Sequence, residues 1–222
     1  MFASIRQLIL QRELRLYSPV QLHDFTLMGT TFYSDPNKLI DQIHDIPSNL
    51  LLQNGRIFPN YYDTNAGTLS LLELAIGKFR PSRVVETGTA NGASARAILK
   101  AFEKFDLSNS ELFSIDIDDR VATADLISNQ QFHFVKIKSA KDFKNSLDSL
   151  GEIDLFYHDS DHSYTNQMFE YVNAWEILSE KNGCLISDDI NWSNAFLDFC
   201  RRVNRIPQIL ADNGKFSGLI VK

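Results

Sequence analysis

The chain has 222 residues, of which 44% are hydrophobic and 23% are charged, and this length suits a single α/β domain with a substantial core. Its net charge of −6 argues against a basic face that grips phosphate backbones, so we expect no nucleic-acid partner. The N-terminal apolar patch at Leu8–Leu10 is too short and too closely flanked by charges for a signal peptide or membrane span, which disfavours a membrane partner.

The first third of the chain differs in pattern from the rest. Ser34-Asp35-Pro36 predicts a helix start, because a capping side chain precedes a proline in the first turn. Thr68 is the predicted cap of a further helix that we expect Gly77 and Pro81 to end. We therefore divide the chain into an N-terminal helical cap or extension, residues 1–67, and an α/β domain, residues 68–222.

From residue 82 onward, strand and helix patterns alternate, which predicts βαβ units and a parallel sheet. The predicted strands are Arg83–Glu86, Leu112–Asp116, Phe132–Ile137, Ile153–His158 and Cys184–Asp188. The predicted helices are Ser94–Phe105, Arg120–Ser128, Lys141–Leu150, Tyr164–Leu178 and Ser193–Val203.

The last two apolar runs, Ile206–Ala211 and Phe216–Val221, are separated only by a segment with Asn213-Gly214, which is a hairpin signal. The sequence thus predicts an α/β three-layer sandwich whose mostly parallel seven-stranded sheet ends in an antiparallel hairpin. This Rossmann-like layout resembles the class I methyltransferase fold. The cysteines, Cys184 and Cys200, form no metal or redox spacing and are expected to be buried free thiols, which is typical of a cytoplasmic protein.

A glycine-containing turn directly follows the first predicted strand. Its spacing is ExGxxxG, whereas the dinucleotide fingerprint would require glycines where Ala90 and Ala93 stand. S-adenosylmethionine (SAM) has no pyrophosphate but carries an ammonium group, which an acidic residue at the strand end suits. A strand–turn–helix junction that binds nothing is the alternative. The candidate cofactor-binding residues in this turn are Glu86, Thr87, Gly88, Thr89 and Gly92.

The second predicted strand ends at Asp116, which can accept both ribose hydroxyls of an adenosine cofactor; its neighbour Ile117 is a further candidate contact. Asp118 and Asp119 instead suit the start of the next helix. Ser139 follows the third strand, where the adenine edge would lie, but it could equally cap the following helix.

Aspartates follow the fourth and fifth predicted strands. Adjacent strands would bring Asp159, Asp188 and Asp189 around one point beside the cofactor, with Asp159 also a cofactor contact. Clustered carboxylates repel one another unless a cation lies among them, and oxygen ligands favour Mg²⁺. The alternatives are a helix cap at Asp161 and turn residues at Asp188-Asp189. His162 is expected to point toward the same cluster of aspartates, and His158 is expected to be structural.

Four segments together resemble the methyltransferases related to macrocin O-methyltransferases and cephalosporin-hydroxylase-like proteins, the methyltransferase family 24 type. They are VVETGTANGASARAIL, LFSIDID, IDLFYHDSDHSY and GCLISDDI. The resemblance implies Mg²⁺-dependent methylation of small-molecule hydroxyls, often on sugars or natural products. It also implies metal ligands at Asp159, Asp188 and Asp189, SAM contacts at Glu86, Gly88 and Asp116, and a general base at Asp161 or His162.

The chain departs from this family pattern in two places. Ser160 stands where a glycine is common, and the stretch between the fifth strand and the hairpin leaves little room for a substrate lid. Residues 1–67, including Tyr61 and Tyr62, would then have to cover the acceptor.

The sequence therefore predicts a SAM-dependent methyltransferase that acts on a hydroxyl of a small-molecule acceptor with Mg²⁺, and that could form a homo-oligomer. A metal-independent small-molecule N-methyltransferase is one alternative, and a non-catalytic SAM- or nucleotide-binding module is another. An NAD-dependent enzyme is the remaining alternative. Base methylation of nucleic acid is disfavoured, because His158-Asp159-Ser160-Asp161 replaces the Asn/Asp-Pro-Pro-aromatic segment of such enzymes.

Overall fold

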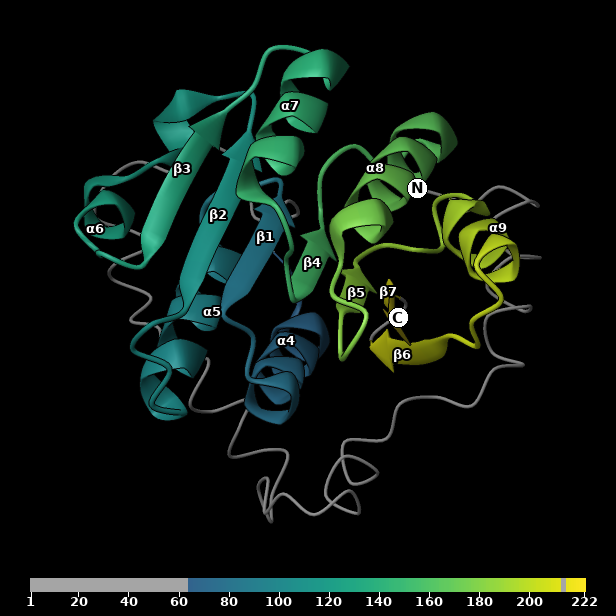
Figure 1. Cartoon of the computed structure of the whole chain (residues 1–222), viewed down its shortest axis with the longest axis horizontal. Helices are drawn as coiled ribbons and strands as arrows, with labels where there is room; N and C mark the ends of the chain where they lie inside the picture. The colour runs from purple at the N-terminus through teal and green to yellow at the C-terminus, as the bar shows by residue number, and fades with distance from the viewer. Residues whose placement is uncertain (1–63, 213–214) are drawn as a thin grey trace.

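The computed structural model describes residues 64–212 and 215–222 (Figure 1). The helices predicted before residue 64, with Tyr61 and Tyr62, lie outside these residues. The helical elements are α4 (Ala66–Phe79), α5 (Ala93–Lys104), the 3₁₀ turn η3 (Asp119–Val121), α6 (Ala124–Ile127), α7 (Ala140–Leu150), α8 (Tyr164–Ile177) and α9 (Ala195–Arg202). The strands are β1 (Arg83–Thr87), β2 (Glu111–Asp116), β3 (Phe132–Lys136), β4 (Leu155–His158), β5 (Cys184–Ser187), β6 (Gln208–Asp212) and β7 (Lys215–Val221).

The strands form one seven-stranded sheet in the order β3-β2-β1-β4-β5-β7-β6. The pairs among β1 to β5 are parallel, and β7 runs antiparallel to both β5 and β6. The predicted sheet and its closing hairpin are thus confirmed. The strand order reverses at β1, whose two neighbours are β2 and β4, and ligands of open α/β sheets bind beyond the carboxyl ends of strands at such a reversal.

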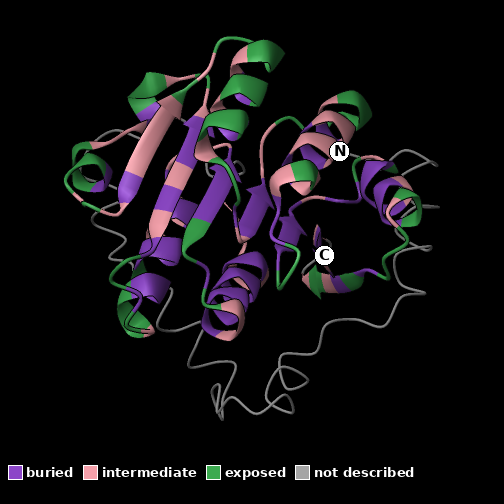
Figure 2. Ribbon diagram, viewed as in Figure 1, coloured by how far each residue is buried: buried purple, intermediate pink, exposed green. Residues whose placement is uncertain are grey.

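Helices cover both faces of the sheet, and successive strand residues therefore pack into different cores. Val84 packs in one core with residues of α4 and α5, whereas its neighbour Val85 packs in the other with residues of α7, α8 and α9. The central strands are buried along nearly their whole length (Figure 2). This two-sided burial explains their continuous apolar runs and confirms the three-layer arrangement. Cys184 and Cys200 are buried free thiols, as predicted.

The boundaries of α4 differ from the prediction. Asn65, not Thr68, is the N-cap, and its side-chain oxygen accepts the backbone N–H of Thr68 over 2.8 Å. The helix runs through Gly77 and ends at Arg80, whose φ is 48°. Ten consecutive residues of α4, Thr68 to Gly77, are buried, so tertiary packing outweighs the low helix propensity of Gly77.

The helix predicted over Arg120–Ser128 is also different, because it splits into η3 and α6. Asp118 accepts the backbone N–H of Arg120, and Thr123 is extended, with a φ of −68° and a ψ of 156°. Side-chain bonds to the local backbone compete with a continuous helix, as is usual for aspartate and threonine.

Candidate functional site

The loop after β1 is held between the ends of β2 and β4. The backbone N–H of Gly88 donates to the carbonyl of Ile115 over 3.0 Å, and a β-carbon on Gly88 would lie 2.1 Å from the carbonyl oxygen of Asp159. Gly88 has a φ of 84° and Gly92 a φ of 77°, a region that glycine occupies readily. Both glycines of the motif are therefore required by backbone conformation.

Asp116 fixes this loop from the end of β2. One carboxylate oxygen accepts the backbone N–H of Thr89 over 2.8 Å, and the other accepts that of Asp118 over 2.9 Å. Asp118 itself is turned toward Arg120, whose side chain holds the Asp118 pKa down at about 2. The structure thus brings Asp116, rather than Asp118, to the glycine loop.

Glu86 lies behind the loop and is fully buried. Ser114 donates its hydroxyl to Glu86 over 2.6 Å and also contacts the Thr89 hydroxyl at 2.7 Å. The other Glu86 oxygen has no hydrogen-bond partner among the described residues, and burial raises the Glu86 pKa to about 7. A cation brought close to this carboxylate would therefore favour its ionised form.

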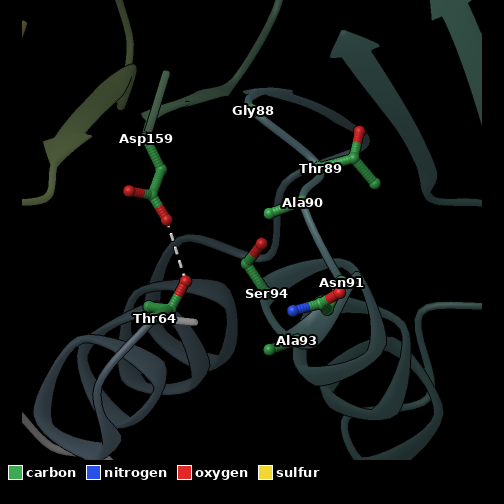
Figure 3. Close-up of a pocket in the computed structure, with 8 residues that line it drawn as sticks. All are labelled: Thr64, Gly88, Thr89, Ala90, Asn91, Ala93, Ser94 and Asp159. Atoms are coloured by element: carbon green, nitrogen blue, oxygen red, sulfur yellow. Dashed lines mark hydrogen bonds between the residues drawn. The ribbon is translucent and has the colours of Figure 1, made fainter. Parts of the chain in front are cut away.

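A small, narrow pocket opens at the glycine loop (Figure 3). Its lining residues are Thr64, Gly88, Thr89, Ala90, Asn91, Ala93, Ser94 and Asp159. Figure 3 shows Asp159 on the opposite side of the pocket from the turn that carries Ala90 and Asn91, with its carboxylate bonded to Thr64. The pocket is small and polar, which suits the aminoacyl end of a cofactor.

Three other predicted cofactor residues lie further from this pocket. The Thr87 side chain faces α8 and donates to Glu170 over 2.6 Å. Ile117 is 71% exposed beyond the end of β2. Ser139 caps α7 by accepting the backbone N–H of Asp142, and its contact with adenine stays a prediction.

A larger cavity of about 780 Å³ adjoins the first pocket and shares Ala90 and Asp159 with it. It contains the three aspartates predicted to lie together. The remaining lining residues are Ser160, Asp161, His162, Ser163, Tyr164, Trp192, Ser193 and Lys215. The tips of β1, β4 and β5 therefore bring the glycine loop and the acidic cluster to one region of the molecule.

Hydroxyl groups hold two of the aspartates, and most of these hydroxyls come from parts of the chain distant in sequence. One oxygen of Asp159 accepts hydrogen bonds from Thr64 over 2.8 Å and from the Tyr157 hydroxyl over 2.9 Å. One oxygen of Asp188 accepts from Thr68 over 2.9 Å and from Ser217 over 2.8 Å. Each of these carboxylates keeps its second oxygen without a hydrogen bond from the described part of the chain.

Burial and the charge of Asp188 make two carboxyl groups of this cavity, Asp159 and Asp189, reluctant to ionise. Burial, followed by the charge of Asp188, raises the Asp159 pKa well above its usual value. The same two causes raise the Asp189 pKa to about 6, although the ammonium of Lys215, 3.9 Å from the Asp189 carboxylate, acts in the opposite direction. A further cation in the cavity would relieve this repulsion.

The donor types of the aspartate trio fit Mg²⁺, because every side chain offers carboxylate oxygens in a cavity with room for water and substrate. Within residues 64–212 and 215–222, no three Asp, Glu, His or Cys side chains already lie in a metal-holding arrangement. Binding would therefore require the second oxygens of Asp159 and Asp188, with the Asp189 carboxylate, to move closer together.

The two candidate bases are placed differently. The Nε2 atom of His162 lies 3.6 Å from an Asp159 oxygen and makes no hydrogen bond within the described chain. Burial lowers the His162 pKa to about 3, so its ring is neutral at pH 7 and is only a weak base while this environment persists. Both oxygens of Asp161 instead accept bonds from Ser163, one from its backbone N–H and one from its hydroxyl, at the start of α8.

Sequence reasoning missed the side chains that support this site. Glu170 of α8 accepts bonds from Thr87, Ser160 and Asn166, and it also bonds the buried ring of His158 at 2.8 Å. His158 is therefore structural, as predicted. Thr64, Thr68 and Ser217 lie 29 to 120 residues along the chain from the aspartates they bind, so no spacing could reveal them. Trp192 also lines the larger cavity. It lies only three residues beyond Asp189, so its position close to the Asp188-Asp189 motif is a sequence signal that could have identified it.

Comparisons with known proteins place this geometry in context. Residues 85–190 match the sequence model of a family described as a methyltransferase domain. No curated protein matches the chain in sequence. Among solved structures, a provisionally assigned caffeoyl-CoA O-methyltransferase from Staphylococcus aureus has a TM-score of 0.61 and 13% identity; the match covers 84% of this chain and 99% of that one.

Two further structures carry the cofactor or its product. The O-methyltransferase from Bacillus cereus, in complex with S-adenosylhomocysteine (SAH), has a TM-score of 0.57 and 15% identity, with 94% of this chain and 100% of that one covered. TomG from Streptomyces achromogenes, an O-methyltransferase of tomaymycin synthesis in complex with SAM, has a TM-score of 0.57 and 15% identity, with 89% and 94% covered. At these identities, the likenesses show a shared fold. Over the described ranges, no helix is both long and apolar enough to cross a membrane.

Proposed function

We propose that this chain, whose residues 85–190 match a methyltransferase-domain family model, is a class I SAM-dependent methyltransferase of the methyltransferase family 24 type. In this proposal it methylates a hydroxyl oxygen of a small molecule such as a sugar or natural product. The main observation in support of this proposal is that the glycine-loop pocket and the 780 Å³ cavity share Ala90 and Asp159. Adjoining pockets let a methyl donor and an acceptor meet. The O-methyltransferase activity of the similar structures supports the choice of oxygen.

In this proposal the glycine loop holds the aminoacyl end of SAM, and Asp116 holds the ribose. Asp116 already anchors Thr89, so its carboxylate is in place beside the loop before the cofactor arrives. SAM supplies an electrophilic methyl group. The chain contributes alignment of the acceptor oxygen with that methyl group, which is a large share of the rate in bimolecular transfer.

The neutral ring of His162 is the better placed proton acceptor. Its Nε2 atom is free of hydrogen bonds within the described chain, whereas both oxygens of Asp161 are engaged by Ser163. His162 can therefore remove the proton of an acceptor hydroxyl that enters the cavity. When the Asp159 carboxylate is ionised, its oxygen 3.6 Å away would favour the imidazolium and so raise the basicity of the ring.

We propose Mg²⁺ as the cation among Asp159, Asp188 and Asp189. When bound, it supplies Lewis-acid polarisation of the acceptor oxygen. Burial, together with repulsion from Asp188, raises the pKa values of Asp159 and Asp189, which supports a need for added positive charge.

Calorimetry with SAH, with and without Mg²⁺, tests the site directly. We expect SAH to bind the wild-type protein, and Mg²⁺ to give a binding heat that Asp188→Asn loses. Asp198→Asn, on the exposed face of α9, is the matched control and should keep that heat. Turnover of hydroxylated acceptors with radiolabelled SAM should fall in Asp188→Asn and in excess EDTA. Unchanged turnover and Mg²⁺ response in Asp188→Asn would refute the metal assignment.

A metal-independent transferase is the second candidate, and Lys215 is the observation that favours it. Its ammonium already lies 3.9 Å from Asp189 and supplies part of the positive charge that the cluster lacks. Activity that survives EDTA but is lost in Lys215→Met would support this candidate, including its form with a nitrogen acceptor.

A further inference from the structure

We infer that Arg96 is a positioning residue that sets the cofactor cleft by joining the glycine loop to the segment after β2. This inference rests on the proposed role of the glycine loop in SAM binding. Arg96 lies in the first turn of α5, one turn beyond Gly92, and its side chain is only 14% exposed. It is not expected to contact the reacting atoms.

The guanidinium of Arg96 uses all three of its nitrogens. Nη1 donates to the backbone carbonyl of Asn91 over 2.6 Å, Nε donates to Asp125 over 2.7 Å, and Nη2 donates to the Thr123 hydroxyl over 3.1 Å. One planar group thus binds the loop and the segment that carries α6. A lysine has no such fork and could satisfy only part of this set.

The loop that Arg96 holds has an unfavourable backbone. Ala90, a residue with a β-carbon, has a φ of 44°, a region that L-residues seldom adopt outside glycine and asparagine. Such conformations persist only where surrounding contacts enforce them. Arg96 donates its hydrogen bond to the carbonyl of Asn91, the residue that follows Ala90.

Gly92 allows this contact. A β-carbon there would lie 2.8 Å from Nη1 of Arg96 and 2.8 Å from a methyl carbon of Leu126. The glycine therefore leaves the space through which the guanidinium and α6 approach the loop. The second glycine of the motif is therefore needed for two reasons: its backbone is left-handed, and a side chain there would block the approach of Arg96.

The two joined segments each follow a strand whose end is proposed to bind SAM, namely β1 and β2. The loop lines the small pocket at the aminoacyl end (Figure 3), and the segment with Thr123 and Asp125 follows Asp116, the proposed ribose ligand. Fixing their separation before SAM arrives lowers the conformational entropy lost on binding. Loss of Arg96 should therefore weaken cofactor binding more than it slows methyl transfer.

The test compares Arg96→Lys and Arg96→Met with the wild-type protein. Arg96→Met keeps an apolar stem over Gly92 and removes the donors. We expect the calorimetric Kd for SAH to rise about tenfold or more in both variants, because a preorganised site becomes mobile. KM for SAM should rise in parallel, while kcat at saturating SAM and KM for the acceptor change by less than about threefold. The amides of Ala90–Gly92 should exchange with deuterium faster.

Arg83→Met is the matched control. Arg83 also donates to two backbone carbonyls, those of Leu150 and Glu152, but it lies at the opposite end of β1. This variant should keep the wild-type Kd for SAH. Thr123→Val removes one of the three acceptors of Arg96, together with the bond from the Thr123 hydroxyl to Asp125. Its Kd for SAH should fall between those of wild type and Arg96→Met, and this smaller change checks that the effect of Arg96→Met is not a folding defect.

The outcomes separate the two proposals. If the wild-type protein binds SAH and both Arg96 variants bind it within about twofold of wild type, Arg96 serves only the fold and the inference is wrong. An equal loss of SAH affinity in Arg83→Met would also contradict it. If the wild-type protein binds no SAH, the proposed cofactor site fails, and the inference fails with it.

Discussion

The carbonyl oxygen of Asp159 lies directly against Gly88, so that a β-carbon on this glycine would come within 2.1 Å of it. The contact joins the first residue of the acidic cluster to the first glycine of the loop. It arises because β1 and β4 are neighbours with Thr87 paired to His158, which places the two strand ends at one level. The donor and acceptor pockets adjoin at this point.

Gly88→Ala should therefore damage both stability and cofactor binding. The new methyl group meets backbone rather than a flexible side chain, and the φ of 84° is itself strained for alanine. We expect a loss of at least about 2 kcal/mol in the free energy of unfolding. Calorimetry should detect no SAH binding.

Gly151→Ala is the control for this prediction. Gly151 has a φ of 69°, but a β-carbon there would find no atom closer than 4.0 Å. Its ψ of −147° places it in a region that is nearly restricted to glycine, so the alanine variant should lose about 1–3 kcal/mol from backbone strain alone and retain SAH affinity. Equal effects of the two substitutions on SAH binding would show that the close approach at Gly88 is irrelevant to the site.

Glu86 should make stability depend on pH. Its pKa is raised from 4.5 in the unfolded chain to about 7 in the fold, so between these values the native state holds the extra proton. Stability should therefore fall as pH rises from about 4.5 to about 7, by on the order of 3 kcal/mol from this group. Glu86→Gln should remove that part of the slope in urea unfolding measured from pH 5 to pH 8.

The comparison with wild type isolates Glu86 from other carboxyl groups with raised pKa values, such as Glu73. Parallel pH profiles for the two proteins would show that Glu86 is not protonated in the fold.

Ser217→Ala tests the hydroxyl groups that hold Asp188. The change removes one of the two donors to a carboxylate oxygen inside the protein. A buried acceptor deprived of a donor should cost about 1–3 kcal/mol of stability. Thermal unfolding should show this loss, and it should shrink in the Asp188→Asn background, where no charge needs the donor. The same loss of stability in both backgrounds would show that the Ser217 hydroxyl does not stabilise the Asp188 carboxylate.

His162→Gln and Asp161→Asn distinguish the two candidate bases. If His162 accepts the proton, its loss should lower kcat by about 10²–10⁴-fold while SAH affinity stays the same. Asp161→Asn should lower kcat only slightly and destabilise the start of α8 by about 1 kcal/mol, because Asp161 binds Ser163 there. A large loss of kcat in Asp161→Asn, with His162→Gln active, would reverse the assignment.

The sequence alone determined the sheet, the glycine loop and the acidic ends of the strands. Alternation of apolar runs and helical patterns is local information, and the right-handed crossovers of parallel strands leave few ways to arrange it. The two left-handed glycines, Gly88 and Gly92, also appear as local signals, because few other residues adopt that backbone. Local patterns failed at boundaries, as at Gly77, where burial of α4 outweighs propensity, and over residues 120–128, where the predicted helix splits into η3 and α6.

Only the tertiary structure decided which side chains support the site. Thr64, Thr68 and Ser217 reach Asp159 and Asp188 from 29 to 120 residues away in the chain, and hydroxyl groups of this kind have no characteristic spacing. The neutral state of His162 likewise depends on burial by elements that meet only in the fold. Periodicity and motif spacing record the neighbours along the chain, whereas desolvation and hydrogen bonding depend on neighbours in space.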